Sequence, residues 1–151
     1  MRLLIDECTD ERFRLLFPSY DCQTARFATL AGLKNGNLLD AAESAAFDVL
    51  LTVDQSIPDQ QNMGGRKNAV LILCAPTNRL RDLKAMVPAA LAALRVIQPG
   101  AGSEDSVTAD RGMPRNSLKR SLAVSSHGIS IRINLGKPIR VVQLIPVLPA
   151  S

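Results

Sequence analysis

The chain has 151 residues, enough for one domain with its own core but short for two. Its hydrophobic content of 46% and charged content of 21% are ordinary for a soluble globular protein. Aromatic residues make up only 3% and there is no Trp, so we do not expect stacking platforms for single-stranded nucleic acid to dominate the surface. Basic and acidic side chains balance over residues 1–100, so the net charge of +4 comes from residues 101–151.

Neither a membrane span nor a secretory signal is expected. The start, MRLLIDE, meets acidic residues too early for a signal peptide, and no apolar run approaches the ~20 residues that a membrane span needs. Cys8, Cys22 and Cys74 form no CxxC pair and have no metal-binding spacing. These features predict a cytoplasmic protein with reduced thiols.

Predicted strands and helices alternate over the first hundred residues. Apolar runs predict strands over residues 2–6, 20–24, 48–53 and 69–75. Helical spacing and capping residues predict helices over residues 9–17, 38–47 and 79–97, and Pro88 should kink the last one or start a new segment. This order is typical of an α/β fold with a mostly parallel four-stranded sheet, so we expect one domain over residues 1–100.

Residues 101–151 have a different composition. Residues 101–119 are rich in Gly, Ser, Asp and Arg without a sustained period and predict a linker. Residues 128–134 alternate and residues 139–148 are apolar, so the two segments could form a β-hairpin. We therefore expect a basic linker and tail, either irregular and partly disordered or folded as a hairpin. It could be a fused extension or the product of a shifted reading frame. Its basic charge would suit nucleic acid or an acidic partner, but we favour a solvated surface or a poorly ordered extension.

Acidic residues follow two of the predicted strands. Asp6 and Glu7 end the first strand, and Asp54 ends the third. Ligands of open α/β sheets lie beyond the carboxyl ends of the strands, so parallel pairing would bring these carboxylates to one edge. Carboxylate oxygens suit Mg²⁺ or Mn²⁺, and the Thr52 hydroxyl could orient a carboxylate or a water. The sequence thus predicts a metal site at this edge that includes Asp6, Glu7 and Asp54.

Three segments, LLIDE, LLDAAE and VLLTVDQSIP, resemble the small PIN-like proteins, which are related to ribonucleases of toxin–antitoxin systems. The resemblance covers about residues 1–98. It implies a three-layer Rossmann-like sandwich and a metal-dependent ribonuclease, with Asp6, Asp54 and Glu7 as the catalytic residues and as ligands of Mg²⁺ or Mn²⁺. It also implies an RNA substrate, with an antitoxin protein and a second copy of the chain as candidate partners.

The sequence departs from the family pattern at two places. Relatives often read Thr-x-Asp-x-Asp-Phe, whereas this chain has Ser56 and Ile57 at the last two positions. Relatives also often have an acid before the central helix, where this chain has Asn35 and Asn37. Asp40, Glu43 or Asp59 could supply a substitute carboxylate.

Two other functions fit parts of the pattern. A receiver-like signalling domain also has an early acidic pair and a strand-end Asp that accepts phosphate, but it needs a Lys after its last strand, where this chain has Pro76. A catalytically degraded PIN-like fold that only binds a partner is favoured by Ser56. No Ser or Cys nucleophile has a base at a recognisable spacing.

Overall fold

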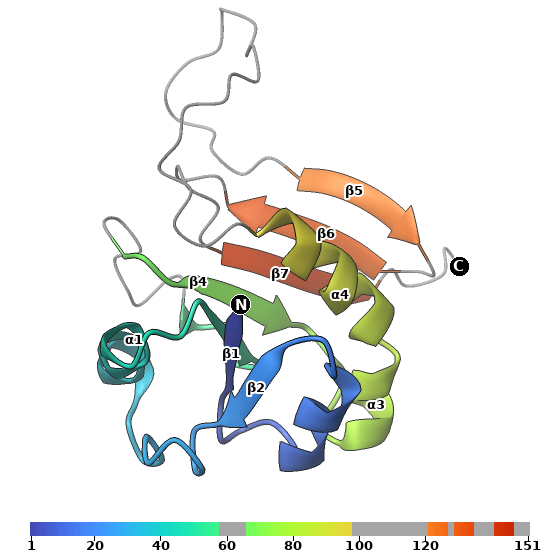
Figure 1. Ribbon diagram of the computed structural model, residues 1–151. Coiled ribbons are helices and arrows are strands. Elements are labelled where there is room, and N and C mark those ends of the chain that lie inside the picture. Colours follow the sequence, from blue (N-terminus) through green and yellow to red (C-terminus); the bar gives the residue numbers. More distant parts are fainter. Residues whose placement is uncertain (58–65, 98–120, 127–128, 135–140, 147–151) are drawn as a thin grey trace, which may run out of the picture.

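The computed structural model describes residues 1–57, 66–97, 121–126, 129–134 and 141–146. Figure 1 shows the elements in chain order. They are β1 (Arg2–Ile5), the 3₁₀ helix η1 (Glu11–Leu16), β2 (Asp21–Thr24), α1 (Asn35–Ser44), β3 (Val49–Thr52), β4 (Ala69–Leu73), α3 (Leu80–Lys84), α4 (Val87–Val96), β5 (Ser121–Ser126), β6 (Ile129–Asn134) and β7 (Val141–Pro146). No described helix is long and apolar enough to cross a membrane.

The four strands expected in the first hundred residues are present and run parallel. β1 lies between β2 and β3, and β4 extends the sheet beyond β3. The complete sheet has seven strands in the order β2-β1-β3-β4-β7-β6-β5, three more than expected from residues 1–100. The fold is therefore α/β, and β2 lies at one edge of the sheet.

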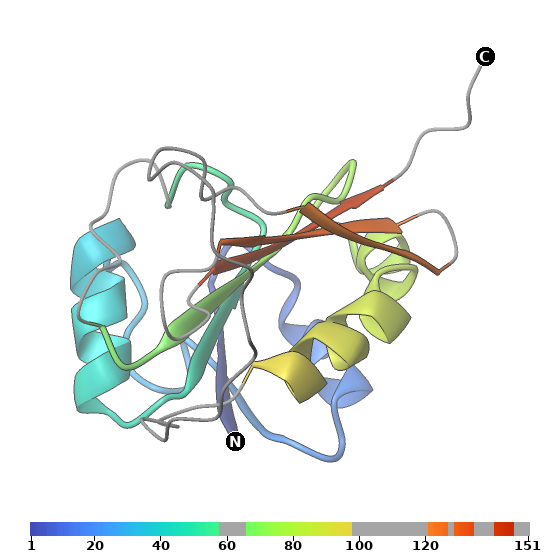
Figure 2. The ribbon, with the colours of Figure 1, turned by 90° about the horizontal axis from the view of Figure 1, so that it is seen from above.

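Helices cover both faces of the sheet. Figure 2 shows α1 on one side, with η1, α3 and α4 on the other. The side chains of the central strands alternate between two clusters: Leu3, Ile5, Leu51 and Leu71 face η1, α3 and α4, while Leu4, Leu50, Val70 and Ile72 face α1. Strands buried on both faces read as continuous apolar runs, which is why their positions could be predicted.

All three predicted helices differ from the sequence-based expectation in detail. The one expected over residues 9–17 is the shorter 3₁₀ helix η1. Residues 79–97 form two helices, α3 and α4, and Pro88 lies in the first turn of α4, where its missing N–H costs nothing. The helix expected from residue 38 already begins at Asn35, so the Asn-Gly-Asn segment forms its first turn. Its N-cap is Lys34, which makes no side-chain capping hydrogen bond.

The C-terminal strands belong to the same sheet. β6 and β7 pair antiparallel, as expected for a hairpin, although β5 was not expected. β7 also pairs parallel with β4, with Val70 opposite Val141 and Leu73 opposite Leu144. Val142 and Leu144 are buried in the cluster beneath α4. The far edge of β4 is thus paired with a strand from residues 101–151.

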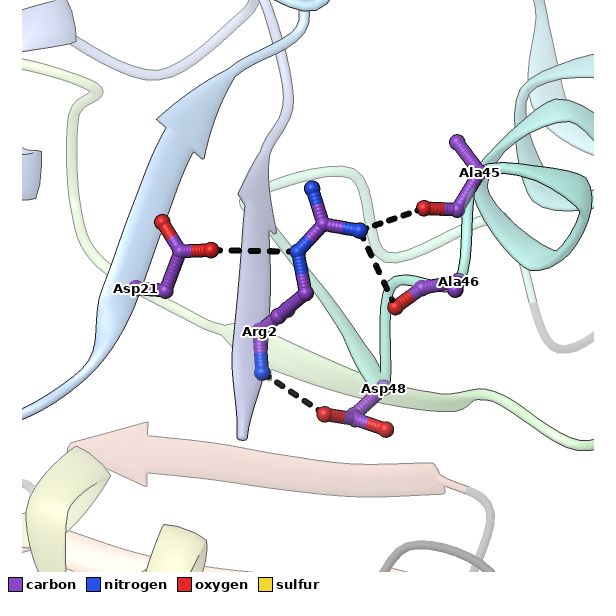
Figure 3. A network of polar contacts seen from close by, with 5 residues as sticks. All are labelled: Arg2, Asp21, Ala45, Ala46 and Asp48. Carbon is purple, nitrogen blue, oxygen red and sulfur yellow. Dashed lines mark hydrogen bonds and ion pairs between the residues drawn. The ribbon is translucent and has the colours of Figure 1, made fainter.

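Arg2 connects the amino end of β1 to its surroundings (Figure 3). Its side chain forms an ion pair with Asp21 of β2 at 3.0 Å and donates to the carbonyl of Ala45 at 2.6 Å. The guanidinium also lies 4.5 Å from the centre of the Phe47 ring. A cation is favoured at the C-terminus of a helix, so Arg2 stabilises the end of α1 while joining it to β1 and β2.

Candidate active site

The predicted carboxylate site begins at the carboxyl ends of β1 and β3. Ile5 pairs with Leu51, and the backbone N–H of Asp6 donates to the carbonyl of Leu51 at 3.0 Å. The next residue of β3, Thr52, is fully buried, and its hydroxyl donates to Oδ2 of Asp6 at 2.7 Å. The Thr52 hydroxyl oxygen in turn accepts from the backbone N–H of Asp54 at 3.0 Å. Thr52 therefore links the Asp6 carboxylate to the start of the Asp54 segment, as expected for a carboxylate-orienting hydroxyl.

Cys8 is a further contact of Asp6. Its thiol donates to Oδ2 of Asp6 at 3.0 Å and lies 3.5 Å from the Thr52 hydroxyl. Burial raises the pKa of Cys8 above its usual value of 9.0, and the hydrogen bond to Asp6 raises it further. The thiol therefore stays protonated at neutral pH and acts as a donor, not as a nucleophile.

Asp6 is nearly buried, and its side-chain hydrogen-bond donors among the described residues are neutral. The residue is 9% exposed, and within those ranges its carboxylate accepts from Thr52 and Cys8. None of the ion pairs formed among the described residues includes it. Buried charges in proteins are normally paired or bound to metal, so this carboxylate is the group at the sheet edge best suited to receive a cation.

Asp54 is held by its own local turn. Its Oδ1 accepts from the backbone N–H of Ser56 at 2.8 Å and from the Ser56 hydroxyl at 2.6 Å. Ser56 occupies the position of the second Asp in the family pattern. Where an Asp would have supplied another carboxylate, Ser56 donates two hydrogen bonds to Asp54.

Glu7 points to a different segment. Its side chain is exposed, and Oε2 accepts from the backbone N–H of Gly32 at 3.1 Å. Gly32 has φ +80°, a conformation that favours glycine. In this position Glu7 fastens the loop between β2 and α1 to the end of β1.

Sequence reasoning did not identify three polar neighbours of the site. The Asn78 side chain donates to the carbonyl of Cys8 at 3.1 Å, although the two residues are 70 positions apart. Thr9 is 5% exposed, and its hydroxyl oxygen has no hydrogen-bond partner among the described residues. Cys8 and Thr9 directly follow Asp6 and Glu7, which was the available signal; Asn78 had none, because only the fold brings it here.

The substitute carboxylates proposed from the sequence have other contacts or lie outside the described residues. Asp40 forms an ion pair with Arg66 at 2.6 Å, and Glu43 accepts from the backbone N–H of Lys67 at 3.3 Å. Both partners precede β4, so these two carboxylates face the amino end of that strand. Asp59 lies outside the described residues.

The donor set fits a loosely held metal better than a closed cage. Across the described ranges, no group of three or more His, Cys, Asp or Glu side chains is arranged to hold a metal ion. Asp6, Glu7 and Asp54 thus follow the strands as predicted, but their side chains do not converge as a group of three. Mg²⁺ usually keeps several waters and takes only one or two protein carboxylates, so the oxygen chemistry of Asp6 and Asp54 fits this ion.

Comparisons with known proteins add no relative: no family model matches the chain, and no curated protein or solved structure matches it either. The candidate function therefore rests on the geometry of the sheet edge and on the sequence pattern.

Proposed function

We propose that this chain is a PIN-like, divalent-metal-dependent ribonuclease that acts in the cytoplasm. The supporting observation is Asp6, a residue that is 9% exposed at a strand end and whose carboxylate has neutral hydrogen-bond donors among the described residues. A buried carboxylate loses most of its hydration, and a bound cation would compensate for that loss. Mg²⁺ or Mn²⁺ is the cation that the hard oxygen donors prefer.

In this proposal the residues have distinct tasks. Asp6 is the principal metal ligand, Asp54 is a second one, and Glu7 holds the neighbouring loop and can turn to the metal as a third. Thr52 fixes the Asp6 carboxylate through its 2.7 Å hydrogen bond. A bound metal would supply a Lewis acid for the phosphoryl oxygen and activate a water. The proposed substrate is RNA. The proposed partners are an antitoxin protein and a second copy of this chain, with which it would form a homodimer.

The test measures metal binding and RNA cleavage on the same full-length proteins. Mn²⁺ at a hundred times its Kd should raise the free energy of unfolding by about 2.7 kcal/mol, because it binds only the folded state. Asp6→Asn should lose this stabilisation and the cleavage of single-stranded RNA. Asp21→Asn is the matched control, since Asp21 lies at the amino end of β2, where it pairs with Arg2. It should keep both properties. RNA cleavage that persists in Asp6→Asn or in excess chelator would refute the proposal.

A second candidate, a PIN-like binding module without catalysis, is favoured by the contacts of the other two carboxylates. Asp54 accepts two hydrogen bonds from Ser56, and Glu7 accepts one from Gly32. Both groups then have structural tasks that do not require a metal. If Mn²⁺ leaves the free energy of unfolding unchanged and the protein does not cleave RNA, this second function is supported over the first.

A further inference from the structure

A pocket of about 320 Å³ lies between η1 and β2, and its lining does not include Asp6, Glu7 or Asp54. Its lining includes Arg12, Arg14 and Leu15 from η1, with Thr24, Arg26 and Phe27 from the end of β2 and the turn after it. β2 is an edge strand of the sheet, and Figure 1 shows η1 beside it. The volume is at the lower end of the range for small-molecule sites, so it suits a ligand about the size of one nucleotide.

Two arginines supply the positive charge of this pocket. Arg12 is already paired with Asp10, at 2.7 Å. Arg14 and Arg26 are exposed, and neither belongs to an ion pair within the described ranges. The sole acidic side chain of the lining is Glu11, so the pocket as a whole favours an anion.

Arg14 and Cys22 both line the pocket, so an anion that enters it would meet the Arg14 charge. Burial raises the pKa of the Cys22 thiol to about 12, while the charges of Arg14 and Asp21 act on it in opposite directions. The thiol therefore stays protonated and adds no negative charge to the pocket.

The pocket also has an exposed aromatic ring. Phe27 is 77% exposed and Leu15 is 64% exposed, whereas the other phenylalanines, Phe13, Phe17 and Phe47, are buried. A ring left in water loses the stabilisation that burial would give it, and a flat ligand could restore that stabilisation by stacking. The scarcity of aromatics limits such stacking to a single base here.

The pocket lies at the same end of the sheet as Asp6. Thr24 pairs in register with Ile5, and the backbone N–H of Ala25 donates to the Ile5 carbonyl at 2.8 Å. Asp6 is the next residue of the chain. A strand of RNA could therefore reach the pocket and the carboxylate from one side of the molecule.

We propose that this pocket binds one nucleotide of single-stranded RNA, with the base stacked on Phe27 and the adjacent phosphates at Arg14 and Arg26. As a substrate site it rests on the proposed ribonuclease function, but binding itself requires no metal. An acidic peptide would use the arginines without needing a flat ring, so the exposed Phe27 favours RNA.

The test is fluorescence anisotropy of a labelled single-stranded RNA of about eight nucleotides with the full chain in excess chelator. Phe27→Ala should raise Kd about tenfold, because stacking of one base contributes about 1–3 kcal/mol. Arg14→Gln with Arg26→Gln should raise Kd by at least as much and reduce the salt slope by about 1.4, which is two phosphate contacts on a single strand.

The controls separate charge, folding and catalysis. Lys84→Gln with Arg95→Gln removes the same charge from exposed positions outside the pocket lining and should leave the salt slope nearly unchanged. Because the Kd values are measured in excess chelator, they do not depend on metal-dependent cleavage, so loss of cleavage and loss of binding are distinguishable. Equal Kd values for wild type and both pocket variants would overturn the inference. So would an acidic peptide that binds wild type as tightly as RNA does and loses its affinity in the arginine variant.

Discussion

The two ends of β1 carry opposite charges, and the fold surrounds them in opposite ways. At the amino end, Arg2 has an anionic partner, two helix-end carbonyls and an aromatic ring (Figure 3). At the carboxyl end, Asp6 is more deeply buried yet has only neutral donors among the described residues. Arg2 is paired within the chain, as is usual for a charge that stabilises a fold. A buried carboxylate with neutral donors, such as Asp6, is more typical of a site that binds a ligand. The contrast separates a structural end from a candidate functional end.

Replacing Thr52 by Val, at the carboxyl end of this pair of strands, should have the largest effect. We expect the free energy of unfolding to fall by about 3 kcal/mol. The change leaves the Asp54 N–H without its acceptor and Asp6 with one donor fewer, and an unsatisfied group near a buried charge is costly. Urea unfolding measures the loss. Thr52→Ser keeps the hydroxyl and should lose less than half as much. Equal losses in the two variants would mean that the hydroxyl has no such role.

Replacing Arg2 by Leu, at the amino end, should have a smaller effect. We expect the free energy of unfolding to fall by about 2 kcal/mol. The variant loses charged hydrogen bonds to the end of α1 and the contact with Phe47, but part of the Arg2 side chain is already in water. Asp21→Asn removes only the exposed ion pair and should cost less than about 1 kcal/mol. If Asp21→Asn cost as much as Arg2→Leu, the ion pair rather than the helix-end contacts would hold this end together.

Ala46→Gly, next to the amino end of β1, should have the smallest effect. We expect the free energy of unfolding to rise by about 0.5–1 kcal/mol. Ala46 has φ 58° directly after α1, where the N–H of Phe47 donates to the carbonyl of Ala42. Glycine adopts this conformation without the steric cost, although it gains entropy in the unfolded chain. Ala45→Gly, at φ −84°, is the control and should be destabilising. Thermal unfolding of the pair distinguishes relief of backbone strain from a general effect of glycine.

The parts of this fold that the sequence predicted are those with local causes. Buried strands are apolar runs, so all four parallel strands and the carboxylates that follow them could be placed in advance. The Thr52 hydroxyl was expected to orient a carboxylate or a water, and the structure identifies its acceptor as Asp6 at the neighbouring strand end. By contrast, the contact of Asn78 with Cys8 and the pairing of β7 with β4 depend on distant segments meeting in space. No local pattern encodes such pairings.

The Asp54 turn lies between these cases. The pattern Asp-x-Ser is a short-range signal for a side chain that accepts from the backbone two residues ahead, and the structure has that contact. Compared with the family, Ser56 was interpreted as a lost ligand. In the fold it is also a donor that holds its neighbour.

The pairing of β4 with β7 has a consequence for synthesis of the protein. Every residue of β4 is buried, and its outer edge waits for a partner that the ribosome makes about seventy residues later. Until then the nascent chain presents an apolar strand with open hydrogen-bonding groups, the kind of edge that recruits other chains. Slow translation before residue 141, or a chain shortened before it, should therefore favour chaperone binding and aggregation over folding.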